Sequence, residues 1–372
     1  MHLKLRFIKM ETKQNHLYSL ATLQLIAVVT IVMGHLWVSE SISVFMNSIC
    51  VSFCFVYSGF FTAKRHNFDS SYRLNDHYHY MFDKLAKMYP MYVLALVVCL
   101  FAFVFLKGQL SFAVKTVLIH LSLLSPWFSS SDIYFGYNAV GWWICDLFFL
   151  YLISPLIVRV LRPMRLPWQA LLIIVLLGLE FIGGYRSSME SDSLLLNYYH
   201  MYEFPPIRIL DFATGIVIFN TTQCAWWKQL SNKLTSNLST VIEALGVLVF
   251  AVLYWFEKTY LHEHCFRAFC ILAPSVVVLL MTFILTSSKM GLLSRLLSSK
   301  PLVVMQQYTF EIYLLQLGVY FALEPLCNKL GISNQPILHF VVQNGALLLA
   351  AWAAHKYYVV PIYRRLGRNR RH

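Results

Sequence analysis

The stretch LATLQLIAVVTIVMGHLW, Leu20–Trp37, decides the fold of this chain, because it is apolar and nearly as long as a bilayer crossing requires. A spanning helix needs about 20 mostly apolar residues, and further stretches of this kind follow along the chain. His35 stands about one turn from the end of the first stretch. An ionisable side chain inside a membrane helix is costly, so His35 is the first candidate for a function.

The composition indicates a membrane protein and excludes an ordinary soluble domain. Of the 372 residues, 58% are hydrophobic and 13% are charged, against about 25% charged in a typical globular chain. The formal net charge of +13 would favour nucleic-acid binding only if the basic residues gathered on one solvated face. They stand instead in short segments between apolar stretches, which is the positive-inside pattern of membrane proteins.

The apolar stretches predict an all-α, polytopic membrane helix bundle with about ten transmembrane helices and both termini in the cytoplasm. A shorter stretch, 111–125, does not fit as a span, since it would place Arg159, Arg162 and Arg165 outside. We expect it to form a short interfacial or re-entrant helix on the outer side. The ten expected spans are 18–38, 43–63, 88–106, 140–160, 168–185, 205–220, 239–256, 266–286, 302–323 and 338–360.

These spans form one membrane domain over residues 18–360, between a cytoplasmic leader (1–17) and a basic cytoplasmic tail (361–372). No cleavable signal peptide is expected, because the first apolar stretch is long and follows a polar, basic segment. The eight cysteines contain no CxxC pair, and His262, Glu263 and His264 in an outer loop are weak evidence for coordination. The sequence therefore predicts no metal site.

Several polar side chains fall at similar depth within the expected spans. By the helix rise of about 1.5 Å per residue, Asp146 lies about two turns from the outer end of its span. Arg208 and Asp211 lie within two turns of an outer end, but their i, i+3 spacing also allows them simply to neutralise each other. His35 also allows an alternative to a functional role, namely a histidine that simply lies at the membrane interface. Gln316 and Glu180 share the outer half, while Glu311 lies nearer the middle.

The two faces of the expected bundle differ in composition. The inner loop 64–87 is basic and rich in Tyr, without GxxxxGK or GxGxxG, so its Lys and Arg could clamp cofactor phosphates, bind anionic lipid headgroups or serve topology alone. The outer stretch 125–143, SPWFSSSDIYFGYNAVGWW, mixes aromatic rings with Ser, Asp and Asn. Such a mixture suits a sugar ring and is also typical of an interfacial aromatic belt.

The residues resemble the integral-membrane acyltransferase-3 family, which transfers acyl groups, usually acetyl, onto extracytoplasmic sugars and related acceptors. The resemblance covers nearly the whole chain. The first stretch resembles the family's first helix, which ends in a histidine, and FPPIRILDFATGI resembles its Arg-x-x-acid-Phe-x-x-Gly stretch. The other matching pieces are FCFVYSGFFTAKR (53–65), KLAKMYPMYVLAL (84–96), WWICDLFFLYLISPL (142–156), Lys300–Gln316 and Tyr357–Arg365.

The chain also departs from the family pattern. Gln24 stands where the first helix carries a basic residue, and Gln316 stands where the penultimate helix commonly carries a histidine. The acid before the tail proline is absent, and the paired Glu of the Trp…Tyr…Pro helix is replaced by Leu147 and Phe148, with Asp146 just before. This last feature resembles the polysaccharide-modifying branch typified by the enterobacterial-common-antigen acetyltransferase. The losses also leave room for an inactive member.

The resemblance implies a reaction in a bacterial inner membrane, with acetyl-CoA as donor substrate, approached from the cytoplasm, and no bound cofactor. His35 is then the expected general base, or a group acetylated first, and Asp146 is expected to orient the imidazole or stabilise its cation. The expected donor-side residues are Gln24, Arg65, Arg73, Lys84 and Lys87. The expected acceptor-side residues are Trp142, Tyr151, Arg208, Asp211, Glu311 and Gln316.

Three functions therefore follow from the sequence. The leading one is an O-acyltransferase, with acetyl as the expected group, that modifies a hydroxyl of a cell-surface polysaccharide or a lipid-linked glycan precursor. The second is a transporter or flippase for a polysaccharide intermediate, because many-span proteins with intramembrane charges are often transporters. The third is a catalytically inactive family member that acts as a scaffold, which Gln24 and Gln316 favour.

Overall fold

The computed structural model describes residues 17–36, 40–106, 114–190, 202–262 and 273–368, and these residues form helices and connecting turns without a strand. The ten segments expected to span the membrane are helical over their described parts, except Ala273, which precedes α14; residues 37–38 and 266–272 lie outside the described part. By length and composition, seven described helices can cross a membrane, and two shorter apolar helices accompany them. The prediction of an all-α polytopic helix bundle is confirmed.

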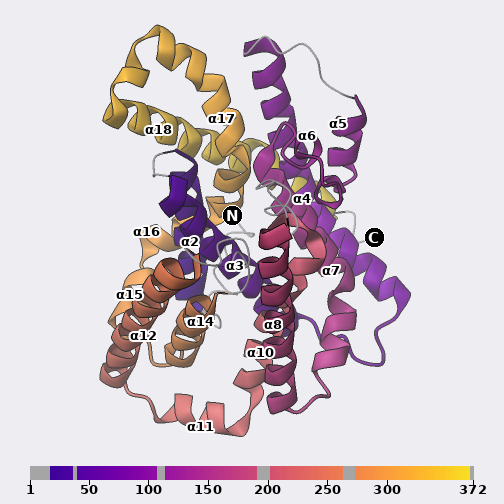
Figure 1. The fold of residues 1–372 in the computed structure, drawn as a ribbon, viewed down its shortest axis with the longest axis vertical. Helices are drawn as coiled ribbons and strands as arrows, with labels where there is room; N and C mark the ends of the chain where they lie inside the picture. Colours follow the sequence, from indigo (N-terminus) through magenta and orange to yellow (C-terminus); the bar gives the residue numbers. More distant parts are fainter. Residues whose placement is uncertain (1–16, 37–39, 107–113, 191–201, 263–272, 369–372) are drawn as a thin grey trace.

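Figure 1 shows the arrangement of the helices, with the short helices α5 and α6 at the end of the bundle opposite α11. The outer stretch 111–125 contains a short helix, as expected, over Val114–Leu121. The helices are α2 (Tyr18–Leu36), α3 (Glu40–Arg65), α4 (Leu74–Phe101), α5 (Val114–Leu121), α6 (Ser131–Tyr134), α7 (Trp142–Leu161), α8 (Leu166–Glu190), η6 (Pro205–Arg208), α10 (Ile209–Gln223), α11 (Ala225–Lys233), α12 (Ser236–Phe256), η7 (Glu257–His262), α14 (Pro274–Thr286), α15 (Leu292–Leu297), α16 (Lys300–Met305), η8 (Gln306–Tyr308), α17 (Thr309–Lys329), α18 (Pro336–Ala354), η10 (His355–Val359) and α19 (Val360–Arg368).

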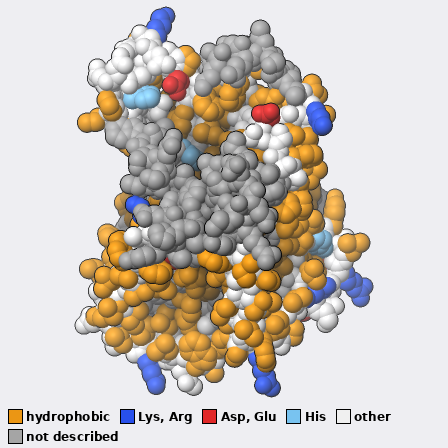
Figure 2. Space-filling model, in the orientation of Figure 1, with side chains coloured by type: hydrophobic (Ala, Val, Ile, Leu, Met, Phe, Trp, Pro, Cys, Tyr) orange, Lys and Arg blue, Asp and Glu red, His pale blue; other side chains and the backbone are white. Residues whose placement is uncertain are grey.

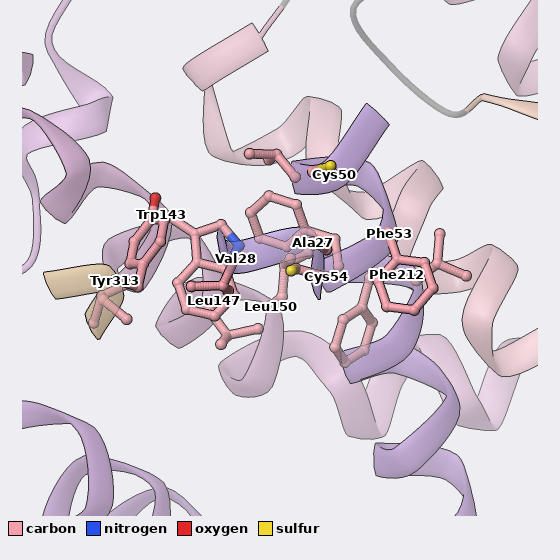
Figure 3. Packing of buried hydrophobic residues seen from close by; sticks show 14 of the residues in the cluster. Ala27, Val28, Cys50, Phe53, Cys54, Trp143, Leu147, Leu150, Phe212 and Tyr313 are labelled. Atoms are coloured by element: carbon pink, nitrogen blue, oxygen red, sulfur yellow. The ribbon is translucent and has the colours of Figure 1, made fainter. Parts of the chain in front are cut away.

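The core forms where α3 and α10 cross at close range. Their contact depends on Gly59 of α3 and Gly215 of α10. A Cβ atom added at Gly59 would lie 2.0 Å from the carbonyl oxygen of Phe212, and one at Gly215 would lie 2.0 Å from that of Val56. Small residues let helix backbones approach in this way inside a membrane. Figure 3 shows Phe53 of α3 and Phe212 of α10 within the surrounding core.

Two buried glutamates of the α12–η7 segment hold the starts of neighbouring helices. The carboxylate of Glu243 accepts hydrogen bonds from the backbone N–H groups of Gly291 (2.9 Å), Leu293 (2.9 Å) and Ser294 (3.2 Å), and from the hydroxyl of Ser294. Glu257 accepts from the N–H and the hydroxyl of Ser275. Helix N-termini leave N–H groups without intrahelical partners, and a carboxylate satisfies them and complements the helix dipole. These two acids are therefore structural.

The outside of the bundle is largely apolar (Figure 2). Large hydrophobic side chains point outward along α8, α12 and α18, for example Ile174 (64% exposed), Leu248 (58%) and Leu349 (68%). A surface of this kind is costly in water but suits the hydrocarbon core of a bilayer. The buried polar side chains lie between the helices instead, and the candidate site is built from them.

Candidate active site

His35 at the end of α2 is held by Gln316 of α17. The imidazole Nδ1 and the amide Oε1 of Gln316 are 2.7 Å apart, and the amide Nε2 donates to the carbonyl of Tyr313 at 2.8 Å. Because the amide nitrogen is already engaged there, Oε1 faces the imidazole and accepts its Nδ1–H. Gln316 is fully buried, whereas the imidazole of His35 is exposed.

This hydrogen bond decides which nitrogen of His35 can act as a base. With the proton on Nδ1, the neutral ring keeps its lone pair on Nε2. The same logic holds in catalytic triads, where a carboxylate fixes the tautomer and the orientation of the histidine. Here a neutral amide does so, and an amide cannot take up a proton. His35 can therefore accept a proton at Nε2 from a hydroxyl, but cannot pass one on through Nδ1.

Asp146 of α7 lies in a different environment from the one expected. It is fully buried, and its electrostatic partners are Arg208 and Glu203. Neither of its carboxylate oxygens has a hydrogen-bond partner within the described ranges. The described hydrogen bond that orients His35 comes from Gln316, so Asp146 is not needed for that role in this geometry.

Arg208 and Asp211 form the internal pair that their spacing allowed. Both are fully buried, with 2.9 Å between Nη1 and the Asp211 carboxylate. Ser52 of α3 donates to the second carboxylate oxygen of Asp211 at 2.6 Å, and Nε of Arg208 donates to the carbonyl of Tyr202 at 2.8 Å. Every hydrogen bond of this carboxylate favours its charged form.

Aromatic rings enclose the guanidinium of Arg208. It lies 4.5 Å from the ring centre of Tyr202, 5.3 Å from that of Phe55 and 5.8 Å from that of Trp142. Cation–π contacts of this kind stabilise a buried cation. Trp142 therefore belongs to the Arg208 environment, and Glu180 of α8, half-buried, also lies within the electrostatic reach of Arg208 and Asp211.

Three of the expected donor-side residues gather at the junction of α3 and α4. Arg65, Lys84 and Lys87, here called the inner basic cluster, all act electrostatically on His66. Burial and these three positive charges lower the pKa of His66 to about 4. These three cations outnumber the one acid, Asp83, that also acts on His66, so a bound phosphate would offset their mutual repulsion.

Arg73 and Gln24 do not belong to this cluster by the contacts of the described residues. Arg73 begins α4, eleven residues before Lys84, which corresponds to about 16 Å along the helix. Gln24 is half-buried on α2, eleven residues before His35. Eleven residues make about three full turns, so Gln24 and His35 share one face of α2 at about 16 Å separation. Buried Val28 and Ile31 lie between them.

Tyr151 lies with the inner basic cluster rather than with Trp142. The Nζ of Lys84 is 4.1 Å from the ring centre of Tyr151 and 5.1 Å from that of Tyr80. Trp142 and Tyr151 are nine residues apart on α7, about 13 Å along its axis. The structure thus separates two residues that the sequence grouped on the acceptor side.

Glu311 has a partner that the sequence did not predict. Its carboxylate lies 2.7 Å from Nδ1 of His355, where the π-helical segment η10 begins. Glu311 lies in the first turn of α17 and His355 directly follows α18, and Tyr363 of α19 lies within electrostatic reach of Glu311. The hydroxyl of Tyr363 donates to the carbonyl of Lys87. This links the Glu311–His355 pair to the inner basic cluster and not to His35.

Sequence reasoning missed His66, His355 and Glu203, and gave Gln316 no link to His35. Glu203 is fully buried although it stands in a segment that reads as an outer loop. Local spacing does not predict the partner of His35, because Gln316 is 281 residues away in the sequence. The loop side chains His262, Glu263 and His264 lie outside the described part of the structure.

Comparison with known proteins identifies the family of this chain. A family model described as an acyltransferase domain matches residues 17–356, which is nearly the whole chain. No curated protein and no solved structure matches the chain. Together with the apolar helices, the match shows a multi-pass membrane acyltransferase, and the chain belongs to the acyltransferase-3 family.

Proposed function

We propose that this protein is an O-acetyltransferase of a bacterial inner membrane, which moves acetyl from acetyl-CoA to a hydroxyl of a cell-surface polysaccharide or a lipid-linked glycan precursor. The observation that carries the proposal is the hydrogen bond between Nδ1 of His35 and Oε1 of Gln316, at 2.7 Å. It leaves Nε2 free to take the proton of the acceptor hydroxyl. As that proton leaves, the hydroxyl oxygen attacks the thioester carbon, and CoA departs as the thiolate.

The donor side of the proposal rests on the inner basic cluster. CoA carries phosphates, and Arg65, Lys84 and Lys87 place three positive charges together around His66. Tyr151, whose ring lies against Lys84, belongs to the same binding surface. Arg73 and Gln24 take no part in it on the described contacts. The cluster thus recognises the nucleotide end of the donor, while the acetyl end reaches toward His35.

The acceptor side rests on the aromatic residues near the outer half of α7. Trp142 and Trp143 are buried there beside Tyr202 and Tyr313, with ring centres 5.2 Å apart in both pairs. Figure 3 shows Trp143 and Tyr313 next to each other. Flat apolar rings beside hydrogen-bonding groups suit a sugar. The missing paired Glu on α7 favours the polysaccharide-modifying branch of the family.

The decisive experiment measures transfer of labelled acetyl from acetyl-CoA to the glycolipid and polysaccharide fractions of the host. Membranes would contain the wild-type chain, His35→Ala or His79→Ala. A general base contributes about 100- to 10,000-fold, so His35→Ala should lose nearly all transfer. His79 is an exposed histidine of α4, and its replacement should have no effect.

Each result separates the possible functions. Label that depends on His35 and not on His79 would establish the reaction and isolate the acceptor. Equal label with wild type and His35→Ala would contradict the catalytic role. No label from any folded variant, together with donor-independent movement of the glycolipid across vesicles, would favour the transporter.

A further inference from the structure

We infer that the acceptor carries a positively charged amino group, as an amino sugar does, and that Asp146 and Glu203 bind it in the core of the bundle. The inference rests on the proposed function and extends it to the chemical class of the acceptor. It is drawn from three features of the buried region around α7 and Arg208: polar atoms without partners among the described residues, more acidic than basic side chains, and a link through Tyr313 and Gln316 to His35.

The first feature is a set of buried polar atoms that lack partners. Both oxygens of Asp146, both oxygens of Glu203 and the indole Nε1 of Trp143 have no hydrogen-bond partner among the residues that the structure describes. The two acids are fully buried, and Trp143 is 6% exposed. Buried polar groups are nearly always satisfied, and leaving a charged one unsatisfied is costly. The described residues therefore supply no hydrogen-bond donor to these four carboxylate oxygens, and a bound ligand could supply them.

The second feature is the charge of the region. Arg208 is the cation that acts on both Asp146 and Glu203, but its guanidinium already forms an ion pair with Asp211. When all four groups are ionised, this fully buried set carries a net charge of −2. Buried charge needs compensation by an opposite charge. An ammonium group supplies both the positive charge and three N–H donors, which a neutral hydroxyl does not.

The third feature places this subsite beside the proposed base. Tyr313 is within electrostatic reach of both Asp146 and Glu203, and its ring packs on Trp143. The carbonyl of the same Tyr313 holds the amide of Gln316, which in turn holds His35. Tyr313 and Gln316 are about one helical turn apart. An amino sugar held by Asp146 and Glu203 would therefore lie beside the Trp143–Tyr313 pair, which Gln316 links to His35.

Three probes of the same ring separate charge from shape: the methyl glycosides of glucosamine, glucose and glucuronic acid. Their binding to the purified protein in nanodiscs would be measured at about pH 6, where the amine is protonated. We expect the glucosamine derivative to bind at least about tenfold more tightly than the glucose derivative, and the anionic glucuronide not to bind.

Asp146→Asn and Glu203→Gln should each weaken the preference, and the double variant should remove it. Asp132→Asn changes an exposed acid of α6 and should leave the preference intact. CoA binding at the inner basic cluster serves as the test that each variant is folded. Equal binding of the cationic and neutral probes, no binding of any probe, or a preference that survives in the folded double variant would overturn the inference.

The two proposals fail separately in this design. Binding of the cationic probe without acetyl transfer would retain the amine subsite and reject the O-acetyltransferase. Transfer that depends on His35 but shows no preference for the amine would retain the enzyme and reject the subsite.

Discussion

At the scale of single residues, the hydrogen bond from His35 to Gln316 indicates what Gln316 does for the imidazole. Members of the family commonly carry a histidine at this position. This chain carries Gln316, whose amide oxygen lies 2.7 Å from the imidazole Nδ1 of His35. An amide oxygen accepts a hydrogen bond from Nδ1–H but offers no charge to stabilise the imidazolium. We therefore assign Gln316 as a positioning residue and not as a catalytic one.

This assignment predicts different results for two replacements of Gln316. Gln316→Leu removes the acceptor, and loss of a supporting hydrogen bond of this kind typically costs about 10- to 100-fold in activity. The loss should appear in kcat, with the KM for acetyl-CoA unchanged, because the donor site is distant. Gln316→Glu restores an acceptor oxygen and should recover most of kcat. If Gln316→Glu were as inactive as Gln316→Leu, the positioning role would be refuted.

His66 predicts a pH dependence of donor binding. Its pKa is lowered from 6.5 to about 4 by burial and by the inner basic cluster, so it is neutral at pH 6 in the free protein. A phosphate bound beside it would raise this pKa. Binding would then take up a proton at pH values between the pKa in the free protein and the higher pKa in the complex. CoA affinity should accordingly strengthen as pH falls from 6.5 toward 4.

The comparison is with His66→Asn, which cannot take up the proton. The phosphates of CoA titrate equally in both experiments, so the ratio of the two dissociation constants isolates His66. We expect this ratio to change in favour of the wild type toward low pH, by at most tenfold per pH unit for one proton. A ratio that is independent of pH would place the phosphates away from His66.

At the scale of helices, the crossing of α3 and α10 positions the buried Arg208–Asp211 pair. Ser52 of α3 binds Asp211 of α10, and Phe55 of α3 packs beside Arg208. These contacts require the two backbones to stay as close as Gly59 and Gly215 allow. The Gly residues of the family-like stretches FCFVYSGFFTAKR and FPPIRILDFATGI thus have a packing reason.

Gly59→Ala and Gly215→Ala should therefore destabilise the protein strongly. The added Cβ would lie 2.0 Å from a backbone carbonyl oxygen in each case, and backbone cannot move aside as a flexible side chain can. Gly178→Ala is the matched control, because no atom lies within 4 Å of its Cβ on α8. Alanine favours a helix over glycine by about 1 kcal/mol in water, so the control should be neutral or stabilising.

Thermal unfolding in detergent measures all three glycine variants under the same conditions. The expected order of unfolding temperature is Gly178→Ala at or above wild type, with the two crossing variants well below it. Wild-type stability of Gly215→Ala would show that α3 and α10 do not pack as described.

At the scale of the whole molecule, the sequence predicted the helices far better than the contacts between them. Hydropathy needs only local composition, and it predicted an all-α bundle in which seven described helices are long and apolar enough to cross a membrane. The partner of His35 lies 281 residues away, and the placement of Tyr151 beside Lys84 depends on how α4 meets α7. Neither follows from periodicity within one helix.

The proposed reaction also requires the two halves of the site to face opposite sides of the membrane. His35 must meet an outer acceptor, while the inner basic cluster must meet cytoplasmic CoA. Ser129 lies in the exposed segment before α6, and Ser70 lies in the exposed segment between α3 and α4. Ser129→Cys and Ser70→Cys are therefore matched reporters. They are best made with half-buried Cys224 replaced by Ser, together with Cys265 and Cys270, which lie outside the described residues.

A maleimide that cannot cross membranes should label Ser129→Cys in intact cells and Ser70→Cys only after permeabilisation. We expect this result because the positive-inside rule places the basic loops in the cytoplasm, and with them residues 66–73, while it places residues 122–137 outside. The reverse pattern would put His35 on the cytoplasmic side. Labelling of both reporters from outside would bring donor and acceptor sites to one face, and a transfer across the bilayer would then be unnecessary.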